Sequence, residues 1–72
     1  MTMNYLIVIE KTRTGYSAYS PDIPGCVTTD RTRKEVEKNM REAIKFHIDG
    51  LREESYKIPE SQSYAIYAEV PA

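Results

Sequence analysis

The feature that most limits how this chain can fold is that only one of its segments has the periodicity of an amphipathic helix. Between Thr32 and Ser55 the apolar residues recur every three or four positions and fall on one face. They are Val36, Met40, Ala43, Ile44, His47, Ile48 and Leu51. Thr32 and Glu35 have the spacing of a capping box, in which each side chain bonds the other residue's backbone amide. We therefore expect a helix that begins at Thr32 and fades between Gly50 and Ser55.

Four other segments have the β-branched and aromatic composition of strands. Three of them precede the helix and one follows it: Met3–Thr12, Tyr16–Ser20, Cys26–Thr29 and Tyr64–Val70. Gly15 ends the turn after the first strand, where we expect it to supply a positive φ. The segment Pro21–Gly25 contains two prolines and a glycine, so it must be a loop.

The order of these elements predicts an α+β fold with two layers and the pattern βββαβ. Short links between the first three strands favour an antiparallel meander. A helix between the third and fourth strands favours a right-handed crossover, which would place residues 64–70 in the same sheet and parallel to the third strand. One long helix would then cover one face of a four-stranded sheet.

The strands are apolar on both faces, although only one helix is available to cover them. In the first strand Tyr5, Ile7 and Ile9 point to one side, and Leu6 and Val8 point to the other. An exposed apolar sheet face usually marks an interaction surface. We therefore expect the second face to be covered by another polypeptide, and the chain to form a homo-oligomer, either a dimer or a tetramer. The alternative is a tyrosine-rich outer face that tolerates water.

Composition excludes several classes of protein. The chain has 72 residues, which suits a single domain, and its lone cysteine, Cys26, cannot form an intrachain disulfide. Cysteine usage of this kind favours a reducing, cytoplasmic location. No apolar run is long enough to span a bilayer, so we expect no membrane contact. The net charge of −1 gives no overall attraction to nucleic acid, and binding would need a local patch such as Arg31, Arg33 and Lys34.

A series of short motifs covers nearly the whole chain. It runs through Gly15-Tyr16, Tyr19–Thr28 with the sequence YSPDIPGCVT, Asp30, Thr32, Ala43-Ile44, His47 and Ile58-Pro59. In this order the motifs resemble the N-terminal domain of HicB-family antitoxins. The resemblance implies a partial RNase H-like fold that binds and blocks a HicA-type toxin, a small mRNA interferase. Many family members continue into a DNA-binding domain, whereas this sequence stops at Ala72, so we expect one domain over residues 1–72 and no direct DNA binding.

The candidate partner-binding residues are four tyrosines and two loop residues. They are Tyr16, Tyr19, Asp22, Ile23, Tyr64 and Tyr67. Tyrosine is enriched at protein interfaces, and a loop stiffened by two prolines loses little entropy on binding. The loop is equally compatible with a purely structural connection. Asp22, Glu10 and Glu69 would offer negative charge to a basic, RNA-binding toxin.

Two other function classes remain open. Glu10 and Glu69 would lie near the ends of neighbouring strands and would bind Mg²⁺ if the protein were a nuclease. His47 is the only histidine, which excludes a two-histidine metal site, and with Cys26 it is interpreted as a core residue. We expect no catalytic residues, metal or cofactor. The other alternative is a small oligomeric scaffold or ligand-binding module without a toxin.

Overall fold

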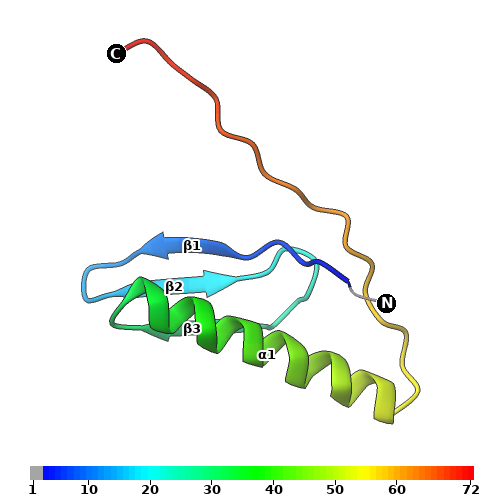
Figure 1. The fold of residues 1–72 in the computed structure, drawn as a ribbon. Coiled ribbons are helices and arrows are strands. Elements are labelled where there is room, and N and C mark those ends of the chain that lie inside the picture. Colours follow the sequence, from blue (N-terminus) through cyan, green and yellow to red (C-terminus); the bar gives the residue numbers. More distant parts are fainter. Residues whose placement is uncertain (1–2) are drawn as a thin grey trace.

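Three short antiparallel strands form the sheet of this protein, whose computed structural model describes residues 3–72 (Figure 1). The strands and the helix are β1 (Val8–Lys11), β2 (Tyr16–Tyr19), β3 (Val27–Asp30) and α1 (Arg33–Glu53). The sheet order is β1-β2-β3, with both neighbouring pairs antiparallel. The predicted α+β class, the meander and the single long helix are confirmed. No helix among the described residues is long and apolar enough to cross a membrane.

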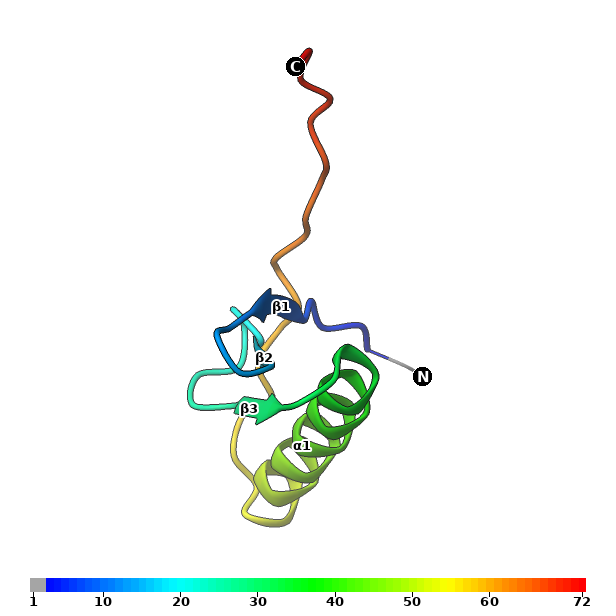
Figure 2. The same cartoon turned by 90° about the vertical axis from the view of Figure 1, so that its left-hand side faces the viewer.

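Helix α1 lies against one face of the sheet, and Figure 2 shows the two layers from the end. It packs mainly over β3 and β2 and contacts β1 less. The buried side chains between the layers are Ala18, Ile23, Cys26, Val36, Met40 and Ile48. Ala43, Ile44 and Leu51 surround this core, so the predicted apolar helix face is largely confirmed. His47 differs from the prediction, because it is only half-buried at the edge of that face.

The strand register separates two faces of the sheet. Ile9, Ala18 and Thr28 lie opposite one another and point toward α1, where Ala18 is buried. Val8, Tyr19 and Val27 form the neighbouring row and point away from α1. Tyr5, Ile7 and Ile9 pack against the core, as the alternation in the sequence predicts. The opposite face of the sheet has no second helix over it (Figure 2).

Both ends of α1 are capped by local hydrogen bonds. The Thr32 hydroxyl accepts from the amide of Glu35 at 3.1 Å and donates to the Glu35 carboxylate at 2.9 Å. Glu35 therefore bonds the Thr32 side chain, whereas the capping box predicted a bond to the Thr32 amide. At the other end Ser55 has a φ of 59°, and the amide of Tyr56 donates to the carbonyl of Leu51 at 2.9 Å. This is the Schellman arrangement, with serine where glycine is usual.

The predicted fourth strand is wrong for the single chain. Residues 64–70 are extended but pair with no strand, and they run away from the body of the protein (Figure 1). The chain does return from α1 to the start of the first strand, because the Tyr5 hydroxyl donates to the carbonyl of Pro59 at 2.5 Å. The Ser61 hydroxyl also bonds the carbonyl of Asn4. These contacts hold the chain before residue 64, and beyond them it leaves the sheet edge.

Gly15 is required by close packing of the backbone, and not by the positive φ that the sequence predicted. The positive φ expected there is found at Gly25 instead, with a φ of 81°. Gly15 lies so close to the backbone of Asp30 and Arg31 that a Cβ atom would overlap the Asp30 carbonyl oxygen. The β1–β2 turn is closed independently by the Thr12 amide, which donates to the Gly15 carbonyl at 2.8 Å. The glycine therefore lets the turn lie directly under the junction of β3 and α1.

Replacing Gly15 by alanine should destabilise the protein, because the added methyl group meets backbone atoms that cannot rotate away. We expect Gly15→Ala to lower the free energy of unfolding by about 1–3 kcal/mol. Gly50 is a matched control, since it lies in α1 with open space around it. Gly50→Ala should raise stability by about 0.5–1 kcal/mol through helix propensity. Thermal unfolding at one protein concentration compares them, and equal effects of both substitutions would contradict this steric explanation.

Candidate functional site

The loop between β2 and β3 holds the root of the C-terminal segment. The Asp22 carboxylate accepts hydrogen bonds from the amides of Gln62 and Ser63, and from the Ser63 hydroxyl, each at 2.9 Å. The pKa of Asp22 is lowered mainly by the hydrogen bond from the Ser63 amide. Desolvation raises this pKa in part, and the bonds from the Gln62 amide and the Ser63 hydroxyl lower it further. An ionised Asp22 therefore joins two parts of the chain that are 40 residues apart.

Two other residues near this loop belong to the core. Ile23 has 1% of its surface exposed and lies among the helix side chains. The amide of Cys26 donates to the Ile23 carbonyl at 3.3 Å, which closes the turn and directs Ile23 inward. Cys26 is buried, as predicted, and burial raises the pKa of its thiol. The structure thus uses Asp22 and Ile23 inside the protomer, which supports the interpretation of this loop as a structural connection.

The four candidate tyrosines do not form one aromatic patch. Tyr16 is half-buried on the helix side of the sheet, whereas Tyr19 lies on the opposite face. Tyr64 and Tyr67 are exposed on the C-terminal segment, outside the body of the protein. The described chain therefore offers two separate apolar surfaces, one on the sheet and one on residues 64–70.

The sheet surface is a row of three side chains that point away from α1: Val8, Tyr19 and Val27, here called the outer row. Val27 has 61% of its surface exposed, which is high for a valine in a strand. Glu10 follows Val8 by two positions in β1, so it lies on the same face of the sheet as the outer row, opposite Ser17 of β2. Val27 was not among the predicted contacts, although alternation from the buried Cys26 would have placed it on this face.

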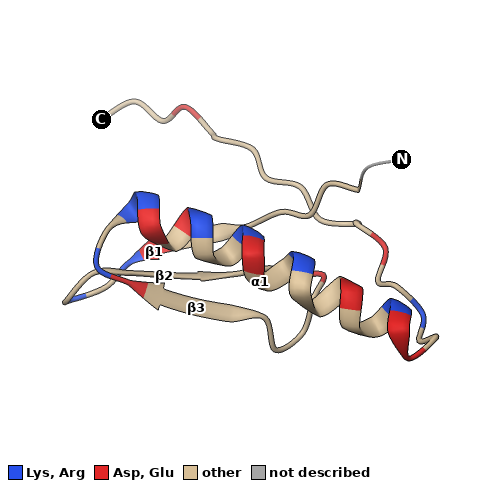
Figure 3. Ribbon diagram, turned by 60° about the horizontal axis from the view of Figure 1, so that its bottom comes forward, with Lys and Arg blue, Asp and Glu red and all other residues tan. Residues whose placement is uncertain are grey.

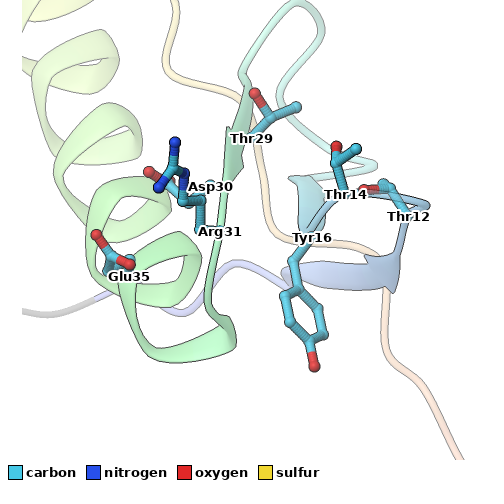
Figure 4. A pocket seen from close by; sticks show the side chains of 7 residues that line it. All are labelled: Thr12, Thr14, Tyr16, Thr29, Asp30, Arg31 and Glu35. Carbon is cyan, nitrogen blue, oxygen red and sulfur yellow. The ribbon is translucent and has the colours of Figure 1, made fainter.

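An open hollow of about 700 Å³ lies at the turn end of the sheet (Figure 4). Its lining residues are Thr12, Thr14, Tyr16, Thr29, Asp30, Arg31 and Glu35. In Figure 4 their side chains come from different sides and do not point toward one common position. Asp30 is already bonded, because it accepts from the side-chain amide of Asn39 at 2.9 Å. This arrangement has no nucleophile with an adjacent base.

The carboxylates considered for a magnesium site are not assembled in the protomer. Glu10 is exposed near the end of β1, and Glu69 lies on the segment that has left the sheet. Within residues 3–72, no group of three or more histidine, cysteine or acidic side chains is placed to hold a metal ion. Two-metal phosphodiester hydrolysis needs several convergent carboxylates. The geometry of the protomer therefore gives the nuclease alternative no support.

The outer side of α1 carries alternating charges (Figure 3). Arg33 and Arg41 both pair with Glu37, at 3.2 Å and 3.6 Å, and Lys45 pairs with Asp49 at 3.0 Å. All three pairs join residues four positions apart, the spacing at which side chains meet along one helix face. Exposed pairs of this kind contribute little to stability. Since basic and acidic groups are interleaved, this face has no continuous basic stripe for a phosphate backbone.

Neutralising Asp22 should release the root of the C-terminal segment. The pKa of Asp22 is lower in the folded protein than the value of about 3.8 expected for the unfolded chain. The attachment is therefore fully present at a pH above the unfolded pKa, and it is lost as the pH falls through the folded pKa. We expect Asp22→Ala to abolish, at neutral pH, the protection of the Gln62 and Ser63 amides from hydrogen exchange. Asp49→Ala, which removes another exposed carboxylate, is the control and should leave both amides unchanged. Protection that survives in Asp22→Ala would contradict the attachment.

Comparisons with known proteins agree with this fold. The family model described as HicB_like antitoxin of bacterial toxin-antitoxin system matches residues 5–72. A UPF0150 protein of Thermoplasma acidophilum is 37% identical over 89% of this chain and 94% of its own length. An uncharacterized 14.9 kDa protein from the rep-hol intergenic region of Haemophilus phage HP1 is 41% identical over 96% of this chain. The present chain spans 52% of that phage protein.

A solved structure described as a HicA3 and HicB3 toxin-antitoxin complex contains a similar chain. Its TM-score to this protein is 0.65 at 40% sequence identity, over 76% of this chain and 64% of that one. The similarity therefore extends over the sheet and the helix and is supported by sequence as well as by shape. With a family match over residues 5–72, this chain belongs to the HicB-like antitoxin family of bacterial toxin–antitoxin systems.

Proposed function

We propose that this protein is an antitoxin that binds a HicA-type toxin, a small mRNA interferase, and blocks it sterically without catalysis of its own. The single observation that carries the proposal is membership of the HicB-like antitoxin family over residues 5–72. The similar chain in a HicA3 and HicB3 complex supports a toxin of that type as the partner. A lone, buried and reduced Cys26 is compatible with action in the cytoplasm.

The outer row is the surface we assign to the toxin. Val8, Tyr19 and Val27 are adjacent across three strands, so they form one contiguous apolar patch on the face that α1 leaves open. Aromatic and aliphatic side chains on a rigid sheet lose little conformational entropy on binding. Tyrosine is also frequent among the residues that contribute most to binding. Of the predicted contacts, Tyr19 is the one that lies on this patch.

Charge would add selectivity for a basic partner. Glu10 borders the outer row, and neither β2 nor β3 carries a basic residue that would neutralise it. A toxin surface that binds RNA must be basic, so Glu10 would attract it and would compete with the RNA phosphates. Asp22 is already occupied by the C-terminal segment, so we assign it no direct part in toxin binding.

Disruption of the outer row should abolish neutralisation of the toxin. We expect Val27→Asp to weaken binding at least about tenfold, because it places an unpaired charge within the proposed contact. The partner tested is the product of the reading frame beside this gene, co-expressed with the antitoxin. Affinity is measured by titration calorimetry and neutralisation by recovery of growth. Circular dichroism confirms that α1 remains folded.

Phe46→Asp is the matched control, since Phe46 is an exposed apolar residue on the opposite side of the molecule. It should leave affinity and neutralisation unchanged. A wild-type protein that neither binds nor neutralises the neighbouring protein would overturn the proposed function. Ribonuclease activity of the purified antitoxin with Mg²⁺, lost in Glu10→Ala, would establish the nuclease alternative instead.

A further inference from the structure

Two parts of the protomer could each pair with a further strand. One is the outer edge of β1, because β1 pairs only with β2. The other is the segment 64–70, which is extended and has no partner in the chain. Unpaired backbone groups at an edge strand are a template for a further strand. The same chain therefore carries both a free strand and a free edge.

The C-terminal segment has the composition of a buried strand and not of a solvated tail. Four of its seven residues are large and apolar, and it carries one charge, Glu69. These four, Tyr64, Ile66, Tyr67 and Val70, are all exposed, and Ile66 has 82% of its surface in water. Exposed apolar side chains grouped in this way usually mark a contact with another polypeptide. No strand among residues 3–72 pairs with the segment, so the protomer itself does not supply this contact (Figure 1).

Residues 5–11, which are β1 and the three residues before it, match this segment in length and in alternation. Residues 5–11 and residues 64–70 are both seven residues long. Tyr5, Ile7 and Ile9 point toward the helix side of the sheet and pack against the core. Tyr64, Ile66 and Val70 are likewise an even number of positions apart, so all three would point to one face of a fourth strand. Aligned on β1, that strand would extend the core.

The space for such a strand is open in the protomer. A hollow of about 320 Å³ beside the first strand is lined by Met3, Asn4, Tyr5, Ile7, Arg41 and Ile44. A second hollow of about 360 Å³ is lined by Ile7, Ile9, Lys11, Tyr16, Arg33 and Tyr67. The Tyr67 ring remains fully exposed there. The chain's own segment therefore borders the free edge without filling the space beside it.

The root of the segment fixes where it leaves the body. The Asp22 carboxylate holds Gln62 and Ser63, and the Ser61 hydroxyl bonds the carbonyl of Asn4. Beyond that point the nine residues 64–72 can extend about 30 Å. This reach is comparable with the 27 Å second dimension of the protomer, so the segment can cross a neighbouring copy. It does not have to fold back on its own sheet.

We propose that two copies of this chain exchange residues 64–70, each segment adding a strand to the free β1 edge of the other copy. A twofold arrangement satisfies both copies at once, since each gives one strand and receives one. β3 has the same four-residue length as β1, but it lies directly between the loop 21–25 and α1, whereas residues 5–7 continue the side-chain alternation of β1. The exchange leaves the outer row free and does not depend on the proposed toxin.

The mass in solution tests the assembly. By light scattering after size exclusion, we expect the wild-type chain to have at least twice its protomer mass of 8.3 kDa. Ile66→Asp should reduce the mass to one protomer, because it places a charge in the exchanged strand. Phe46→Asp is the matched control, since Phe46 is equally exposed at 81% but lies on α1. A monomeric wild type, or an Ile66→Asp variant that retains the wild-type mass, would overturn the proposal.

A disulfide between chains tests the exchange itself. In a Cys26→Ala background, one chain carries Val8→Cys and another carries Tyr67→Cys, and the two are unfolded and refolded together. Exchange predicts a covalent dimer that contains one chain of each kind. The double variant should give mainly dimers, and an internal disulfide in a monomer would show that the segment closes on its own sheet. Absence of any linkage between the two kinds of chain would likewise contradict the exchange.

Discussion

The rest of this structure depends on the contact between one helix face and two of the three strands. Val36 and Met40 are completely buried, and with Ile48 they meet Ala18 and the loop residue Ile23. This contact uses the buried apolar face of α1, and it is centred on β2 and β3. In a domain of this size one such layer supplies most of the hydrophobic stabilisation. The apolar surfaces of the sheet that α1 does not cover can be buried only by other contacts.

The two uncovered regions follow from this limit. The face behind the sheet keeps the outer row in contact with water, and β1 keeps a free edge with open space beside it. The two regions differ in their chemistry, because a face offers side chains whereas an edge also offers backbone hydrogen bonds. This difference is why the face suits a folded toxin and the edge suits an extended segment of the same chain. The two contacts can therefore form at once.

Local rules predicted most of the body correctly. The periodicity from Val36 to Leu51 and the cap at Thr32 located the helix, and the proline-rich loop separated β2 from β3. Long-range contacts were harder to predict. The need for Gly15 arises from the Asp30 backbone, 15 residues away, and the role of Asp22 arises from Ser63. Residues 64–70 have a strand sequence, yet a sequence cannot state which chain supplies their partner. The four tyrosines were grouped by residue type, whereas the strand register and the free segment separate them.

The contact of Gly15 with the Asp30 backbone has a consequence for how the domain could diverge. The hairpin tip and the junction between β3 and α1 are in contact without a side chain between them, so a shift of one must displace the other. A residue inserted in the hairpin would have to tilt the helix axis, and with it the alignment of Val36 and Met40 over the sheet. Length changes should therefore be tolerated after Glu54, where the chain is exposed, far better than between Lys11 and Tyr16.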